Sequence, residues 1–290
     1  MPYSIRDLKL EEFPPLLKEI PDPPKKLFLA GSLPKEENKI LCIVGSRKYT
    51  QYGKEICEKL ISEIKGYPIT IVSGLALGTD SIAHKAAMKN GLQTVALPGS
   101  GLNSKNLYPS SHLPLAEEII ENGGGLLSEF DPDFKATLWS FPQRNRIMAG
   151  ISHAVLIIEA EIKSGTLITS RLATEYNRDV MTVPGSIFSK NSEGPHMLIK
   201  LGATPVTSGE DILKVLNIET SITKNNQSFD ISNEMLSEDE KKIVELLHNP
   251  VTRDDLIRQS GMPASKINMI ITAMEIKGII TESVGEIRIN

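Results

Sequence analysis

Short, largely apolar runs recur between residues 39 and 216, and each is followed by a segment with helical spacing. The runs ILCIVG (40–45), ITIVSG (69–74) and HAVLIIEA (153–160) contain few polar positions. Strands that are buried on both faces have this composition, and parallel sheets are covered by helices on both sides. Because strands and helices alternate with short connections, the pattern predicts an α/β fold with a Rossmann-like, doubly wound and mostly parallel sheet.

The segments on either side of this region have a different character. Residues 1–38 are rich in proline and charged residues. The proline pair at Pro14 and Pro15 excludes a long helix there, so we expect an extended segment that packs along the α/β domain. Residues 217–236 are polar and turn-rich, which favours a linker.

Residues 237–290 form a second pattern. The segment SEDEKKIVELLHN begins with Ser237 and carries Glu240 three residues later, as in a helix capping box. Two further helical segments end at Gly261 and Gly278, and the final IITESVGEIRIN predicts a hairpin. Three helices followed by a β-hairpin predict a small winged-helix domain.

The composition, 40% hydrophobic and 23% charged residues, is that of a soluble globular protein. No apolar run reaches the roughly 18 residues that a membrane span needs. The N-terminal MPYSIRDLKLEEFPP carries charges where a signal peptide would need an apolar stretch. We therefore expect a cytoplasmic protein without membrane association.

The distribution of charge limits where nucleic acid could bind. The net charge is −4, so any DNA-binding surface must concentrate the positive charge in one place. Residues 237–290 carry seven Lys and Arg against nine Asp and Glu, which is too acidic a balance for duplex phosphates. Because its third helical segment is also largely apolar, we expect this domain to contact protein rather than to read duplex DNA.

Glycine-rich turns follow the predicted strands, at the carboxyl ends where open α/β sheets bind ligands. The first turn contains Ser46 and Arg47, the second Gly74 and the third Gly101. Glycine lets a ligand approach the backbone, amides at a helix start favour an anion, and arginine suits phosphate. Each turn alone also fits an ordinary strand-to-helix connection, but three in series predict a phosphate-binding edge.

Aromatic and basic residues follow in the segments FPQRNR and EIKSGT. Phe141 precedes Arg144 and Arg146, and Lys163 lies in the turn after a later strand. Aromatic rings beside cations suit the bases and phosphates of a single strand. Core packing is an equal alternative for Phe141, and the two arginines could instead pair internally with an acid such as Glu159.

Sequence motifs of catalysis and metal binding are missing. There is no GxxxxGK[ST] phosphate loop, no GxSxG nucleophile turn and no histidine cluster with metal-ligand spacing. His84 lies four residues beyond Asp80, and we expect it to be a hydrogen-bonded residue on a helix surface. We expect no catalytic residue, no cofactor, no metal site and no enzymatic activity.

Six motifs in series closely resemble the DprA/Smf (DNA-processing protein A) family. They are GSR (45–47), SGLALGTDSIAH (73–84), LPGSG (97–101), FPQRNRIMAG (141–150), EAEIKSGTLITSRLA (159–173) and GPHMLIKLGA (194–203). The resemblance implies that the chain binds single-stranded DNA, loads the RecA recombinase onto it in natural transformation, and forms a homodimer. It also implies DNA contacts at Ser46, Arg47, Gly74, Gly101, Phe141, Arg144, Arg146 and Lys163.

The sequence departs from many members of that family in one respect, and two other functions remain as alternatives. Residues 1–38 are too few for the sterile-alpha-motif-like domain that many members carry before the core, so functions tied to that domain are not expected. The KSGTL segment also resembles the loop of lysine-decarboxylase-like enzymes of the Rossmann type, which would make the same edge a nucleotide site of an enzyme or sensor. A third alternative is an adaptor that recruits the recombinase through the winged-helix domain.

Overall fold

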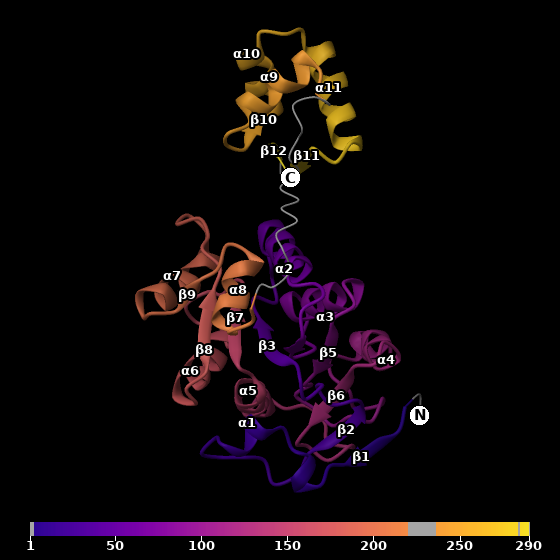
Figure 1. Ribbon diagram of the computed structural model, residues 1–290. Coiled ribbons are helices and arrows are strands. Elements are labelled where there is room, and N and C mark those ends of the chain that lie inside the picture. The colour runs from indigo at the N-terminus through magenta and orange to yellow at the C-terminus, as the bar shows by residue number, and fades with distance from the viewer. Residues whose placement is uncertain (1–2, 220–235, 284, 290) are drawn as a thin grey trace. The chain divides into compact units, whose positions relative to one another are not determined.

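The computed structural model describes residues 3–219, 236–283 and 285–289, and the chain divides into two compact units, Met1–Glu219 and Thr220–Asn290. A nine-stranded sheet with the order β1-β2-β6-β5-β4-β3-β7-β8-β9 forms the centre of the first unit (Figure 1). Its strands are β1 (Ile5–Asp7), β2 (Phe28–Gly31), β3 (Lys39–Val44), β4 (Ile69–Ser73), β5 (Gln93–Ala96), β6 (Gly125–Ser128), β7 (Ala154–Ile157), β8 (Asp179–Thr182) and β9 (Thr204–Pro205).

The greater part of this sheet is parallel and covered on both faces. All neighbouring pairs from β6 to β9 are parallel. Successive residues of β3 enter different core layers, with Cys42 and Val44 in one and Leu41 and Ile43 in the other. The predicted doubly wound, Rossmann-like sheet is confirmed.

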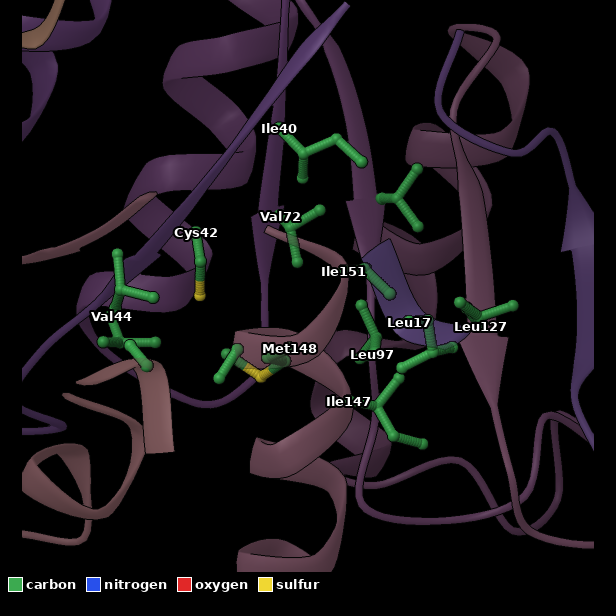
Figure 2. Packing of buried hydrophobic residues seen from close by; sticks show 14 of the residues in the cluster. Leu17, Ile40, Cys42, Val44, Val72, Leu97, Leu127, Ile147, Met148 and Ile151 are labelled. Atoms are coloured by element: carbon green, nitrogen blue, oxygen red, sulfur yellow. The ribbon is translucent and has the colours of Figure 1, made fainter. Parts of the chain in front are cut away.

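Helices on the two faces supply the rest of these layers. The Cys42 layer includes residues of α1 (Pro15–Lys18), α5 (Ser140–Ile151), α6 (Thr166–Glu175) and α7 (Glu193–Lys200). The Leu41 layer includes residues of α2 (Gln51–Glu63), α3 (Thr79–Lys89) and α8 (Gly209–Val215), while α4 (Leu113–Glu121) packs beside β5 and β6. Figure 2 shows Ile147, Met148 and Ile151 of α5 among the strand residues that they cover.

The N-terminal segment joins the sheet. Strand β2 pairs antiparallel with β6, and β1 pairs antiparallel with β2, so residues before 38 extend the sheet at one edge. Between β1 and β2 lie a short 3-10 helix, η1 (Leu10–Glu12), and α1. Leu17 and Leu27 of this segment are fully buried. Two further 3-10 helices, η2 (Ser110–His112) and η3 (Lys190–Ser192), precede α4 and α7.

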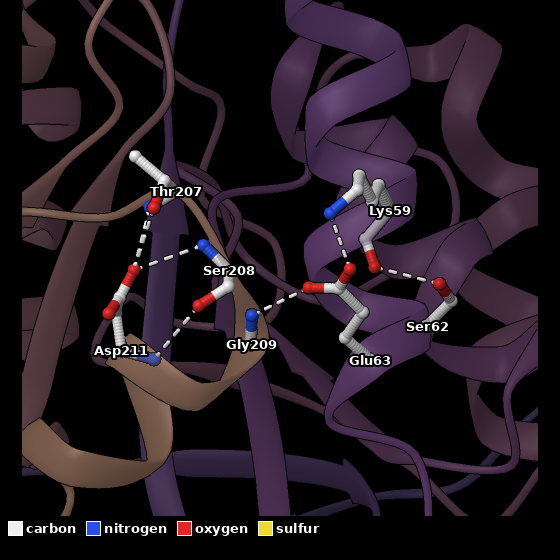
Figure 3. Close-up of polar contacts among 7 residues, drawn as sticks. All are labelled: Lys59, Ser62, Glu63, Thr207, Ser208, Gly209 and Asp211. Atoms are coloured by element: carbon white, nitrogen blue, oxygen red, sulfur yellow. Dashed lines mark hydrogen bonds and ion pairs between the residues drawn. The ribbon is translucent and has the colours of Figure 1, made fainter. Parts of the chain in front are cut away.

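The last helix of the first unit, α8, is fixed to α2 by polar contacts (Figure 3). The Glu63 carboxylate accepts a hydrogen bond of 2.6 Å from the Gly209 N–H and also pairs with Lys59. Ser208 caps α8 in a capping box with Asp211. These contacts therefore hold α8 against α2 at the end of the first unit.

The second unit has its own core. Helices α9 (Glu238–Leu246), α10 (Arg253–Ser260) and α11 (Ala264–Ile276) pack with a three-stranded sheet of order β10-β12-β11. Its strands are β10 (Val251–Thr252), β11 (Ile280–Ser283) and β12 (Glu286–Ile289). Ser237 and Glu240 form the expected capping box. The predicted winged-helix fold is confirmed, while most of the linker expected at 217–236 lies outside the described residues.

Cys42 and Cys57 are both buried and free of disulfides. Within the described ranges, no helix combines the length and the apolar character needed to cross a bilayer.

Candidate nucleic-acid interface

A pocket of about 440 Å³ lies at the carboxyl ends of β3, β4 and β7. The chain adds β4, β5 and β6 on one side of β3 and then β7, β8 and β9 on the other. The sheet order thus reverses between β3 and β7, and such a switch point is where open α/β sheets bind ligands. Five of the predicted residues line this pocket, namely Ser46, Arg47, Phe141, Arg144 and Lys163.

The turn after β3 is held by its neighbours. The Ser46 carbonyl accepts hydrogen bonds from the Thr79 amide (3.2 Å) and hydroxyl (3.1 Å), and the Ser46 hydroxyl accepts one from the Lys48 amide (3.0 Å). A Cβ on Gly45 would lie 2.6 Å from the Thr79 hydroxyl oxygen, so only glycine fits. The Thr166 hydroxyl donates to the Gly45 carbonyl (3.1 Å), which links the turn after β3 to the start of α6.

Arg47 and Phe141 form a cation–aromatic pair at the pocket, in which Arg47 is exposed and Phe141 is half-buried. The guanidinium carbon of Arg47 lies 5.5 Å from the centre of the Phe141 ring, within the range of a cation–π interaction. Tyr108 packs against the same ring at a centroid distance of 5.5 Å. A Cβ on Gly99 would lie 2.5 Å from the ring, so that glycine leaves room for it. The side chain of Arg47 is therefore positioned at the mouth of the pocket.

Arg144, in contrast, is buried, and its side chain forms part of the pocket floor. Its guanidinium donates hydrogen bonds to the carbonyl oxygens of Gly74 and Leu97, just beyond β4 and β5. The Asp80 carboxylate accepts from the amides of Gly74 (3.0 Å) and Ala76 (3.3 Å). A Cβ on Gly74 would lie 2.5 Å from Arg144 Nη1 and 2.6 Å from Asp80 Oδ2. Gly74 thus provides space for these two charged groups.

Burial dominates the ionisation of both groups. It lowers the pKa of Arg144 to about 10, an effect that the nearby Asp80 charge partly offsets. It also raises the pKa of Asp80, which Arg144 and the backbone amides of Ala76 and Gly74 oppose. Arg144 still carries its charge at neutral pH, since a pKa of about 10 lies well above 7.

Lys163 lies in the turn between β7 and α6. Its side chain is exposed, and it lines the pocket together with Glu161 and Ser164. Lys163 therefore places a second exposed cation at the pocket, opposite the turn that carries Arg47.

Some amides at the starts of α2 and α6 are used within the protein. At α6, the Thr166 and Leu167 amides donate to the hydroxyl and carbonyl of Ser164 at 3.2 and 3.1 Å. At α2, Thr50 caps the helix by accepting from Gly53, and the helix begins five residues after Ser46 rather than directly behind it. The amides of Gly53, Thr166 and Leu167 thus have partners within the protein, and the expectation that helix-start amides hold an anion stays a prediction for the other amides of these two turns. The pocket also offers side-chain cations.

Three predicted residues lie outside the pocket lining, namely Gly74, whose neighbours are described above, Arg146 and Gly101. Arg146 pairs with Glu129 and donates to the Asp22 carbonyl (2.7 Å), which ties α5 to the N-terminal segment. The Gly101 amide donates to the Phe134 carbonyl (2.9 Å), and a Cβ on Gly101 would lie 2.2 Å from the Asp131 carbonyl oxygen. The structure thus gives Arg146 and Gly101 contacts that hold loops together.

Some pocket residues were not singled out from the sequence. Lys48 and Asn145 both line the pocket, and each directly follows a predicted residue in the chain. Their positions next to Arg47 and Arg144 in the chain are the sequence feature that could have pointed to them. His84 is fully buried, with Nδ1 2.7 Å from the Thr94 hydroxyl, so its expected place on a helix surface is wrong. Burial lowers the pKa of His84 to about 3.

Family models match both units of the chain. Residues 5–217 match the family described as DNA recombination-mediator protein A, and residues 231–286 match the DprA winged helix domain. The chain belongs to the DNA recombination-mediator protein A family. The resemblance inferred from the six sequence motifs is confirmed.

Individual relatives of this family are similar over about seven-tenths of this chain. Protein Smf of Escherichia coli is 43% identical over 210 residues, which are 71% of this chain and 54% of Smf. DNA processing protein DprA of Streptococcus pneumoniae is 42% identical over 211 residues, which are 73% of this chain and 72% of the relative. The match therefore spans about half the length of Smf and about seven-tenths of the DprA relative.

Solved structures of the family share the fold. The X-ray structure of DprA from Streptococcus pneumoniae superposes with a TM-score of 0.68 at 39% identity, covering 73% of this chain and 74% of that one. DprA from Helicobacter pylori superposes with a TM-score of 0.66 at 29% identity, covering 74% of this chain and 96% of that one. The Helicobacter structure concerns that protein's single-stranded DNA binding mode.

Proposed function

We propose that this chain binds single-stranded DNA at the pocket between the β3 and β7 turns. The proposal is carried chiefly by the Arg47 guanidinium, which lies 5.5 Å from the centre of the Phe141 ring. A base can stack on this cation–aromatic pair while phosphates contact Arg47 and Lys163, which is the chemistry of sequence-tolerant single-strand binding. The similar Helicobacter protein, whose structure concerns its single-stranded DNA binding mode, supports the same substrate.

The eight predicted residues divide into three groups. Ser46, Arg47, Phe141 and Lys163 line the pocket with groups that a strand can reach. Arg144 and Gly74 shape the floor, since Arg144 is 6% exposed and donates to the Gly74 carbonyl. The remaining two predicted residues, Gly101 and Arg146, would support DNA binding indirectly, by holding loops in place.

We further propose that the chain hands the bound strand to the RecA recombinase, acts as a cytoplasmic homodimer in natural transformation and recombination, and catalyses no reaction. A role in recombination fits the family to which the chain belongs. A homodimer is supported by an apolar hollow of about 670 Å³ between α6 and α7, where Leu201 is 76% exposed. Residues 39–216 would be the DNA-binding core, with 1–38, 217–236 and 237–290 as lead-in, linker and winged helix.

Replacing Arg47 with alanine is expected to weaken binding of every single-stranded sequence by about tenfold, because one charge-assisted contact is lost. The slope of log affinity against log salt should fall by about 0.7, the value for one phosphate of a single strand. Fluorescence anisotropy of labelled oligo-dT at several salt concentrations measures both quantities.

The matched control for Arg47→Ala is Arg6→Ala. Arg6 is an exposed arginine on β1 that pairs with Glu12 and does not line the pocket. Unchanged oligo-dT binding by Arg47→Ala would contradict the proposed site. Stronger thermal stabilisation of the wild-type protein by a mononucleotide than by oligo-dT would instead favour a nucleotide-binding enzyme or sensor.

The winged-helix unit is expected to contribute little DNA affinity. Five of its seven Lys and Arg form ion pairs within the unit, among them Lys266 with Asp239 (2.7 Å) and Lys277 with Glu240 (2.6 Å). These pairs leave few cations for duplex phosphates. Deleting residues 220–290 should change the affinity for oligo-dT by less than about twofold. Tight duplex binding by the isolated unit at physiological salt would refute this expectation.

A further inference from the structure

The loop after β8 lies beside the turns that form the pocket. Because β8 is parallel to β7, both strands end at the same edge of the sheet. The Asn191 side-chain amide donates to the Lys48 carbonyl (3.0 Å), and the Asn191 carbonyl accepts from the Ala160 amide (2.8 Å). The Tyr52 hydroxyl donates to the Pro184 carbonyl (2.7 Å). This loop is therefore attached both to the turn after β3 and to the turn after β7.

The same loop presents two apolar side chains to solvent. Phe188 is 92% exposed and Ile187 is 79% exposed. The loop is nevertheless held by its own turn, since the Phe188 amide donates to the Ser186 hydroxyl (3.3 Å) and the Ser189 amide to the Ser186 carbonyl (3.0 Å). An ordered turn thus presents a phenyl ring that no part of the described chain covers.

Two exposed lysines lie where this loop joins the turn after β3. Lys190 is exposed two residues after Phe188, and exposed Lys48 lies where Asn191 joins the loop to the turn after β3. Lys48 also lines the pocket that contains Arg47. The acids nearby are the buried Glu159, which accepts from the Asn191 side-chain amide (3.5 Å), Glu161 in the pocket wall and Glu193 at the start of α7. A row of cations therefore runs from Arg47 through Lys48 to Lys190.

We propose that Phe188 is a second base-stacking site for the strand that the pocket holds, with Lys48 and Lys190 contacting the phosphates between the two sites. This inference rests on the proposed function. Single-stranded binders combine a cationic groove with aromatic rings that stack on successive bases. A duplex shows no free base face to such a ring, so the occupant is single-stranded DNA that leaves the pocket toward β8.

The test compares affinities over a series of oligo-dT lengths, from about 4 to 16 nucleotides. Phe188→Ala should bind the longest oligonucleotide about tenfold more weakly than wild type, and the shortest one equally well. Arg47→Ala should lose affinity at every length, because it acts in the pocket that the shortest oligonucleotide already fills. The control is Leu10→Ala, which removes a 65% exposed leucine from η1 at the opposite end of the sheet.

A direct probe is Phe188→Trp in a Trp139→Phe background, which leaves tryptophan at position 188 alone because the natural chain has a single one. Long oligo-dT should quench its fluorescence and short oligo-dT should not. If Phe188→Ala matches wild type at every length while Arg47→Ala is weakened, the stacking site is wrong and the proposed function stands. If wild type binds no oligo-dT at any length, the proposed function itself is wrong. Loss of self-association by Phe188→Ala, with unchanged DNA affinity, would assign the ring to a protein interface and overturn the stacking site.

Discussion

Replacing Arg144 with alanine is expected to lower the free energy of unfolding of the first unit by about 3–5 kcal/mol. The guanidinium is buried and donates to the Gly74 and Leu97 carbonyls, which lose their partner when it is removed. The Asp80 carboxylate would also be left buried without its cation, and an unpaired buried charge is more costly than an unpaired polar group. Urea unfolding followed by the fluorescence of Trp139 measures the effect, because the only tryptophan lies in this unit.

A control for this stability loss is Lys214→Ala, which breaks only an exposed pair with Glu210 on α8. It should change the free energy of unfolding by about 0.5 kcal/mol or less. If Arg144→Ala kept the stability of wild type but abolished binding of oligo-dT, Arg144 would be a direct DNA contact rather than a support of the pocket floor.

The fold could be read from the sequence where burial leaves a strong pattern. The run ILCIVG predicted the strand that the structure has at Lys39–Val44, because both faces of β3 are covered and every residue from Ile40 to Val44 is buried. The N-terminal strands β1 and β2 carry no such signal, since they are three and four residues long. The pairing of β2 with β6 is a tertiary contact that no local pattern of the N-terminal segment encodes.

The arginines of the RNR segment show why the site could be predicted only in part. Arg144 and Arg146 are two residues apart on α5, so their side chains point about 200° apart around the helix axis. In the sequence, the two residues are of the same type and share the neighbour Asn145. Only the packing of α5 shows that Arg144 reaches Gly74 and Leu97, while Arg146 reaches Glu129.

The partners of the helix-start amides could not be predicted for a related reason. A glycine-rich strand-to-helix turn predicts open amides, but their use depends on side chains that lie close only in the folded chain. Ser164 accepts from the amides of Thr166 and Leu167 at the start of α6. The exposed cations of the pocket are Arg47, Lys48 and Lys163, whose exposure the sequence could not establish.

The double variant Arg47→Ala, Lys163→Ala is expected to bind oligo-dT about a hundredfold more weakly than wild type. The two cations lie on different turns of the pocket, after β3 and after β7, so each can contact a different phosphate. Contacts without shared partners contribute additively to the binding free energy, and two losses of about tenfold multiply. Anisotropy titrations of the double and both single variants measure this directly, and the salt slope should fall by about 1.4.

Folding and binding must be separated for this double variant. Both side chains are exposed, so the free energy of unfolding measured by Trp139 fluorescence should stay within about 0.5 kcal/mol of wild type. Wild-type stability with a hundredfold weaker affinity would identify the β3 and β7 turns as the two sides of one DNA site. If the double variant bound no more weakly than Arg47→Ala, the strand would pass the β3 turn without reaching Lys163. The path from the pocket toward Phe188 would then have to avoid the turn after β7, although Asn191 connects the Phe188 loop to both turns through Ala160 and Lys48.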